Sequence, residues 1–388
     1  MTKEFVKFTL TFVSACIFLV QTQAQQSINI VTTAVPFLRI SPDPRGGAMG
    51  DVGIATMPDV NSNFWNVAKT PFNKTNSAIG VNYTPWLKDL GLNDVYLASL
   101  SGYHKLDDNQ TISASLRYFS LGNIQFTDFS GNALSSYRPR EFAIDLGYSI
   151  KLSDNMALGA SFRYINSSLA SGDVNNSGVV YKAGTSVAAD IALYYDGTAN
   201  KSGEGFSWGI ALSNLGSKIG YTSDSKNKDF IPANFGLGVA YTTALNESSK
   251  LSFALDMNKL LVPAAPQATG NTSTDSAALA NYRSQSVMSS WFKSFGDGTS
   301  LTSSLQFSLG TEFWYDNKFA LRAGYFYQDK SSGRNPFFSV GVGVKYEMFG
   351  INLSYLVPSG SGITRNPLSN TLRLGISFDL DNGDERKF

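Results

Sequence analysis

Apolar and polar side chains alternate with a period of two along most of the chain from Ser77 onward. The clearest stretch is 140–152, in which every second residue from Phe142 to Leu152 is apolar. The residues between them are small or charged, as Asp145 is. Because successive side chains of a strand point to opposite faces, this pattern predicts strands with one apolar and one polar face.

The same pattern recurs along the chain and predicts about 14 strands, an even number that is typical of a single-chain outer-membrane barrel. A soluble sandwich also alternates, but these runs are long enough to cross a bilayer when tilted. The predicted strands are 77–84, 93–104, 109–121, 139–152, 155–167, 184–196, 205–214, 234–243, 249–258, 301–315, 318–328, 336–346, 349–357 and 370–380.

The connections between these strands alternate between short and long. The short ones are 105–108, 153–154, 244–248, 316–317 and 347–348, and the long ones are 122–138, 168–183, 215–233, 259–300 and 358–369. Outer-membrane barrels have short periplasmic turns and long extracellular loops. The sequence therefore predicts an all-β, antiparallel transmembrane barrel with both termini in the periplasm. The longest loop has room for a short helix within 276–295.

Residues 1–24 have the features of an export signal. Lys3 and Lys7 precede the apolar run 8–20, and a small-residue cleavage site follows and ends at Ala24. The apolar run is too short to span a membrane comfortably. A lipoprotein signal ending at Cys16 is the other alternative, although the apolar run continues past that residue. We predict a signal peptide at 1–24 that is removed on export.

Residues 25–76 do not alternate and are rich in Pro, Gly, Asp and Asn. In a wide barrel such a segment can occupy the lumen. We therefore predict an N-terminal lumenal plug at 25–76 and the barrel with its long extracellular loops at 77–388.

Composition argues against several other functions. The formal net charge of +1 does not favour a nucleic-acid partner, which would select a basic surface. Cys16 is the only cysteine and lies in the predicted signal, so the mature chain would have no thiolate nucleophile. His104 is the only histidine. We therefore expect no metal centre, no cofactor and no catalytic residues.

The region 35–72 contains a dense motif of Gly, Asp and Pro residues. Its members are Pro36, Phe37, Leu38, Pro42, Asp43, Arg45, Gly46, Gly47, Met49, Gly50, Asp51, Gly53, Ala55, Thr56, Pro58, Asp59, Ser62, Trp65, Asn66, Ala68 and Lys69. This motif resembles the N-terminal region of the PorV family, also called LptO. Pro44 stands where that family usually has Ala. Val67 replaces the proline of an Asn-Pro-Ala core shared with FadL-like transporters, so the turn there is less rigidly set.

The resemblance implies a FadL-like barrel of about 14 strands with an N-terminal plug, in the type IX secretion system. It implies that the barrel binds the C-terminal domain of cargo emerging from the SprA/Sov translocon and delivers it to the PorU sortase complex. Outer-membrane lipid is the other expected partner. Two alternatives stay open. A FadL-like transporter of hydrophobic small molecules would require an apolar pocket behind the plug, and a lipid A esterase would require a catalytic set.

The candidate site residues fall into two groups. The plug motif consists of Pro42, Asp43, Arg45, Gly46, Gly47, Met49, Gly50, Asp51, Asp59, Trp65 and Asn66. Close backbone approach inside a plug is the preferred interpretation of its glycines, over a nucleotide-binding loop. Partner contacts are expected on the long loops, with packing at the membrane interface as the alternative. The candidates there are Tyr221, Phe230, Trp291, Phe292 and Phe295.

Charged residues of both signs occupy positions that should face the lumen. They are Arg117, Arg163, Arg322, Lys345, Arg373, Glu141, Asp145, Asp190, Asp256 and Glu312. Mixed signs predict a network of ion pairs in the lumen, because an ion-selective pore would carry charges of one sign.

Overall fold

A computed structural model describes residues 33–88, 91–127, 130–173, 178–198, 203–224, 227–297, 301–329, 336–357 and 370–380. The signal peptide predicted at 1–24 lies outside these residues, as does 25–32, the first part of the predicted plug. In the described part of the chain, no helix is both long and apolar enough to cross a membrane.

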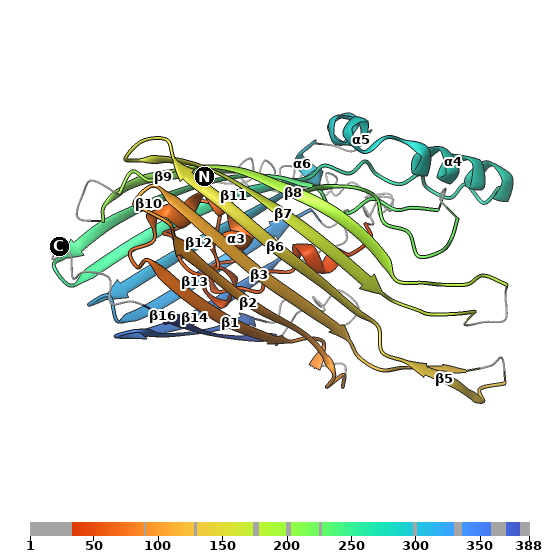
Figure 1. The fold of residues 1–388 in the computed structure, drawn as a ribbon, viewed down its shortest axis with the longest axis horizontal. Helices are drawn as coiled ribbons and strands as arrows, with labels where there is room; N and C mark the ends of the chain where they lie inside the picture. Colours follow the sequence, from red (N-terminus) through yellow and green to blue (C-terminus); the bar gives the residue numbers. More distant parts are fainter. Residues whose placement is uncertain are drawn as a thin grey trace, which may run out of the picture.

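Among the described residues, fourteen antiparallel strands form a closed barrel (Figure 1). Their bounds are β1 Ser77–Pro85, β2 Val95–Lys105, β3 Gln110–Leu121, β6 Arg140–Lys151, β7 Met156–Ser168, β8 Gly184–Tyr195, β9 Gly205–Gly216, β10 Asn234–Asn246, β11 Ser249–Leu260, β12 Leu305–Tyr315, β13 Phe319–Gln328, β14 Phe337–Tyr346, β15 Phe349–Val357 and β16 Leu372–Asp379. The ring closes where β1 pairs with β16, from Ala78 opposite Asp379 to Tyr83 opposite Leu374. The predicted barrel is confirmed, with strand ends shifted by a few residues.

The long connections contain structure of their own. The connection after β3 holds a hairpin of β4 Ile124–Thr127 and β5 Ala133–Tyr137, which the sequence did not predict. The longest connection holds α4 Thr272–Ser284 and α5 Val287–Lys293, where the sequence predicted a single short helix. The strand predicted from 301 begins only at Leu305, because α6 Leu301–Ser304 precedes it. These elements project from one end of the barrel, called here the long-loop end (Figure 1); the opposite end is the short-turn end.

The outward side chains form a surface suited to lipid. Leu146 in the middle of β6 is apolar and largely exposed. Near the long-loop end, Tyr83 and Tyr96 lie with ring centroids 5.5 Å apart. Near the short-turn end, Phe349 and Phe378 lie 5.2 Å apart. An apolar band between two aromatic belts is typical of outer-membrane barrels.

Residues 33–72, called here the N-terminal segment, run within the ring of strands (Figure 1). The segment forms short helical pieces, which are η1 Pro36–Arg39, α2 Pro44–Ala48, α3 Ser62–Trp65 and η2 Val67–Phe72. Helix α2 contacts β14 and β15, whereas η2 contacts β6 and β7 on the other side of the ring. The segment therefore crosses the lumen. That it closes the lumen to solutes stays a prediction.

An apolar cluster holds the start of the N-terminal segment at the long-loop end of the lumen. Val35, Phe37 and Leu38 pack there against inward side chains that include Leu97 and Phe119. Phe37 is fully buried, and its ring centroid lies 6.4 Å from that of Phe119. Burying a side chain of this size contributes roughly 1.5–3 kcal/mol. Apolar burial therefore holds this part of the segment, together with a hydrogen bond from Arg117 on β3 to the carbonyl of Leu38.

Candidate functional site

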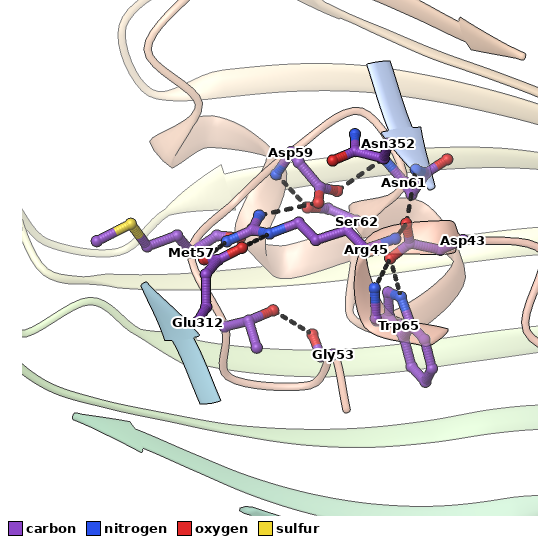
Figure 2. A network of polar contacts seen from close by, with 12 residues as sticks. Asp43, Arg45, Gly53, Met57, Asp59, Asn61, Ser62, Trp65, Glu312 and Asn352 are labelled. Atoms are coloured by element: carbon purple, nitrogen blue, oxygen red, sulfur yellow. Dashed lines mark hydrogen bonds and ion pairs between the residues drawn. The ribbon is translucent and has the colours of Figure 1, made fainter. Parts of the chain in front are cut away.

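Asp43 links separate parts of the N-terminal segment (Figure 2). It caps helix α2, because its carboxylate accepts hydrogen bonds from the backbone N–H groups of Arg45 (2.8 Å) and Gly46 (2.9 Å). It also accepts hydrogen bonds from Asn61 Nδ2 (3.1 Å) and Trp65 Nε1 (2.9 Å). Aspartate is a preferred residue at the start of a helix. One carboxylate thus sets the helix start and fixes the returning chain against it.

Arg45 joins the N-terminal segment to the barrel wall (Figure 2). Its Nε and Nη2 donate to Glu312 on β12 at 2.9 and 2.7 Å, the paired geometry of a guanidinium and a carboxylate. Its Nη1 donates to Asp59 Oδ2 and to the carbonyl of Met57, both at 2.9 Å. Glu312 also accepts a hydrogen bond from Arg322 Nε on β13 at 2.6 Å. Because Arg45, Glu312 and Arg322 are buried, removing Glu312 would deprive two buried guanidinium groups of a carboxylate partner.

Further polar contacts anchor the segment elsewhere around the ring. Arg373 on β16 donates to Asp51 at 2.7 Å. Asp256 on β11 accepts hydrogen bonds from the backbone N–H groups of Gly53 (2.7 Å) and Ile54 (2.9 Å). Strands β16 and β11 are well separated around the barrel. The segment is therefore tied to distant parts of the wall, which restricts its movement as a unit.

Glycines in the motif stand where the backbone approaches other atoms closely. Gly50 has φ +74°, and a Cβ there would lie 2.7 Å from the backbone nitrogen of Tyr325. A Cβ on Gly46 would lie 2.6 Å from the ring of Trp65. Glycine permits both the left-handed conformation and the close approach. The other motif residues Pro42, Gly47 and Met49 are buried as well.

Asn66 starts the last helical piece of the segment. Its Oδ1 accepts a hydrogen bond from the backbone N–H of Ala68 (3.0 Å), and its Nδ2 donates to the carbonyls of Ile54 (3.2 Å) and Leu193 (3.1 Å). Val67, which stands at the position of the usual proline, is buried in an apolar cluster. The turn therefore forms without proline, because Asn66 caps it and β8 supplies an acceptor.

A second set of buried charges lies on the barrel wall itself. Arg117, Asp145, Arg163 and Asp190, on neighbouring strands from β3 to β8, form a ladder of alternating sign. The Arg163–Asp190 contact measures 2.8 Å and the Arg117–Asp145 contact 3.3 Å. Arg117 Nη1 also donates to the carbonyl of Leu38 at 3.2 Å, so the ladder touches the N-terminal segment. The mixed-sign network predicted from inward-facing positions is confirmed for these residues.

Two of the predicted inward charges lie in different surroundings. Glu141 is buried and accepts a hydrogen bond from Ser167 Oγ at 2.6 Å. Lys345 has a side chain that is 46% exposed, and its Nζ lies 2.8 Å from Asp379. Lys345 has the inward parity of Gly343, as predicted, but its side chain is partly exposed because it stands one residue before the end of β14, at the short-turn mouth of the lumen.

Burial changes the acid–base properties of the N-terminal segment. Burial, followed by the nearby Asp59 carboxylate, raises the pKa of Asp43, and the hydrogen bond from Trp65 acts in the opposite direction. Burial lowers the pKa of Lys69 to about 8, although the Asp59 carboxylate opposes this shift. Lys69 Nζ donates to the carbonyl of Gly53 at 2.8 Å. The sequence did not single out Lys69 as a site residue. The sequence signal that could have identified Lys69 is a charged residue inside a segment predicted to be buried, because a buried charge requires polar partners.

A cavity of about 40 Å³ lies between the N-terminal segment and the inner faces of β3, β7 and β9 to β13. Most of its lining side chains are polar or charged, and they include Arg39, Asn214, Asn234 and Gln306. A cavity that takes a benzene molecule has a volume of roughly 150 Å³, whereas a water molecule requires roughly 10–15 Å³. This cavity is therefore of a size for a few water molecules.

The aromatic residues predicted as loop contacts divide into buried and exposed ones. Phe230 is buried, and its ring centroid lies 5.3 Å from that of Tyr282 on α4. It supports the loops from inside and is not accessible to a partner in this structure. The others are Tyr221 and Trp291, which are partly buried, and Phe292 and Phe295, which are exposed.

Within the described residues, no three side chains of His, Cys, Asp or Glu are grouped as metal ligands would be. His104, near the short-turn end of β2, has its Nδ1 2.8 Å from Ser77 Oγ at an exposed position. Its surroundings are those of a surface side chain.

Comparison with protein-family models identifies the family of the chain. A family model described as "Type IX secretion system protein PorV" matches residues 22–267, which is more than half of the chain and includes the whole motif at 35–72. The chain belongs to the PorV family. A PorV-family barrel is an outer-membrane component of the type IX secretion system. No curated protein matches the chain.

The PorV-family barrel also resembles solved barrels of the FadL type. The toluene transporter TodX of Pseudomonas putida superposes with a TM-score of 0.50 at 13% identity, over 86% of this chain and 96% of TodX. The toluene transporter TbuX of Ralstonia pickettii gives 0.47 at 10% identity, over 86% and 95% of the two chains. A Pseudomonas aeruginosa FadL homologue gives 0.46 at 12% identity, over 91% and 99%. At such identities the likeness to TodX shows the fold alone.

Proposed function

We propose that this PorV-family barrel is a carrier in type IX secretion. It binds the C-terminal domain of cargo emerging from the SprA/Sov translocon and delivers the cargo to the PorU sortase complex. The main support is that the lumen is crossed by a segment held through buried ion pairs, among them Arg45–Glu312. A barrel with so little free interior acts through its loops and outer surface, where rigid scaffolds usually present binding sites.

Transport of hydrophobic small molecules is the weaker candidate. It requires an apolar pocket behind the N-terminal segment. The cavity found there measures about 40 Å³, and both Arg117 and Arg163 line it. An apolar solute gains little free energy when it leaves water for a polar site, because the driving force depends on apolar burial. The inner surface therefore favours the carrier role.

The hairpin β4–β5 offers a surface for cargo. It extends beyond the barrel at the long-loop end (Figure 1) and forms a sheet of its own, apart from the barrel strands. In a sheet of only two strands, each strand presents an outer edge of backbone donors and acceptors. Extended protein segments bind such edges by adding a strand. We expect the cargo domain to contact this hairpin first.

The test replaces 124–137 by a short Gly-Ser linker and follows cargo in cells. Because the hairpin lies outside the barrel, the variant should insert normally, and cargo should accumulate in the periplasm unprocessed. Insertion of the same linker in the turn 247–248 is the control, since that turn lies at the other end. Normal cargo processing in the hairpin variant would exclude the hairpin contact. Normal processing in a strain lacking the whole protein would exclude the carrier role.

A further inference from the structure

Helix α5 has its apolar and polar sides reversed relative to a helix in water. Met288, Phe292 and Phe295 follow a spacing of four and three residues, so they lie on one side. Their exposed fractions are 69%, 77% and 52%. The opposite side carries Ser290 and Ser294, which are 0% and 1% exposed. A surface helix in water buries its apolar side and exposes its polar side. The segment is therefore suited to apolar surroundings.

The buried serines show how the reversed arrangement is stable. Ser290 Oγ donates to the carbonyl of Val287 at 2.6 Å, and Ser294 Oγ donates to the carbonyl of Trp291 at 2.7 Å. Their hydroxyl groups are thus satisfied within the helix, which removes the cost of burying them. Their small size also lets the helix approach its support closely.

The segment that follows α5 packs on the outside of the barrel wall. Asn258 on β11 points inward, because it lines the lumenal cavity. The next residue, Lys259, therefore points outward, beside its pairing partner Phe235 on β10. An outward residue at this position would be exposed, yet Lys259 is buried, and its Nζ lies 5.2 Å from the ring centroid of Phe295. Phe295 thus covers the outer face of β11.

This contact lies at the edge of the aromatic belt of the long-loop end. Two residues before Lys259, Met257 pairs with Phe307, which in turn pairs with Tyr327. Toward the long-loop end, the exposed outward side chains Val187 on β8 and Leu237 on β10 are aliphatic, and the outward aromatic ring of Phe235 on β10 is only partly exposed. Segment 287–297 brings exposed aromatic side chains to this part of the ring.

We propose that residues 287–297 lie in the outer-leaflet interface of the membrane, where they complete the aromatic belt and anchor this side of the barrel in lipid. Lipid is the occupant because the stripe continues the lipid-facing surface of the wall. The exposed Lys293 at the end of α5 has the length to reach headgroup phosphates, while the neighbouring rings stay at the interface. This role is independent of the proposed binding of cargo.

The test measures where a nitroxide label at position 292 lies. Phe292→Cys is made in a Cys16→Ala background and reconstituted, full length, in phosphatidylcholine vesicles. Leu255→Cys on the lipid-facing wall and Asn281→Cys on the exposed side of α4 are the references. The label at 292 should be relaxed more by dissolved oxygen than by a polar nickel chelate, as at 255. The label at 281 should show the reverse. Met288→Cys, on the same stripe, should behave as Phe292→Cys does.

Two outcomes would overturn the proposal. One is a label at 292 and 288 that the chelate reaches as readily as it reaches 281, because the stripe would then face water. The other is a label that oxygen reaches in vesicles but that neither oxygen nor the chelate reaches in native outer membranes. A protein partner would then cover the stripe in place of lipid. Phe292 is largely exposed, so its replacement should not impair folding.

Discussion

Replacing Glu312 by Gln should loosen the N-terminal segment by a large and measurable amount. Glu312→Gln keeps the shape of the side chain but turns one carboxylate oxygen into an N–H donor. Both oxygens now accept hydrogen bonds, from Arg45 and Arg322, so one guanidinium would face another donor. Removing one partner of a buried ion pair costs about 3–5 kcal/mol. Since about 1.4 kcal/mol is a tenfold change, release of the segment should become at least roughly a hundred-fold more favourable.

The assay follows a cysteine introduced at a buried position of the segment. Ser62 is fully buried, and Ser62→Cys in a Cys16→Ala background changes one atom there. A polar maleimide reacts with this thiol only when the segment opens, so the reaction rate follows the opening equilibrium. Glu247→Gln removes a carboxylate from an exposed turn and is the control, with an expected effect within about 0.5 kcal/mol.

One result would refute this reasoning. If the thiol at position 62 reacts equally fast with and without Glu312→Gln, in a barrel that is still folded, the ion pairs do not hold the segment. The apolar cluster around Phe37 would then be the main restraint.

Two further predictions concern the same segment. Gly50→Ala should release it, because the added Cβ meets the backbone of Tyr325. Gly91→Ala is the control: Gly91 has a similar φ of +78° but nothing within 4 Å of the added Cβ, so this change introduces only the backbone strain of about 1 kcal/mol. Equal effects of the two changes on maleimide reaction would contradict the close contact. The pKa of Lys69 is about 8 in the folded protein and ordinarily 10.5, so between these values the unfolded state binds more protons and stability rises with pH. Lys69→Met should abolish that rise in a series of unfolding midpoints, and its persistence would assign it to another group.

The strands follow from the sequence because each has one face in lipid. Within the part of each strand that crosses the lipid, an outward residue must be apolar whatever the lumen contains, so the alternation is regular there. The strand predicted at 139–152 therefore matches β6, Arg140–Lys151, within a residue at each end. The hairpin β4–β5 was missed because both faces of β4 are largely exposed to solvent. No alternation of apolar and polar residues marks such a strand.

The candidate site is predictable only in part. The motif indicates a segment with close backbone contacts, and alternation places Glu312 and Arg322 on the inner wall. The pairing of Glu312 with Arg45 could not be predicted from the sequence, because these two residues stand 267 positions apart. Several inward carboxylates, such as Asp145, Asp256 and Glu312, could pair with Arg45 equally well by sequence alone. The closure of the ring and the position of α2 decide between them, and both depend on the whole chain.

A fold shared with a toluene transporter is compatible with a lumen unsuited to toluene, because different faces of the same strands set the two properties. The outward residues face lipid and must be apolar, and this requirement specifies the strands of the barrel. The same fold can therefore form at 13% identity, as the TM-score of 0.50 with TodX shows. The inward residues are constrained only by what passes through the lumen or fills it. Here they pair with one another and with the N-terminal segment, as Arg117 does with Asp145 and with the carbonyl of Leu38. The inward face, more than the fold, is therefore where the proposed carrier role and the transport of small molecules make different demands.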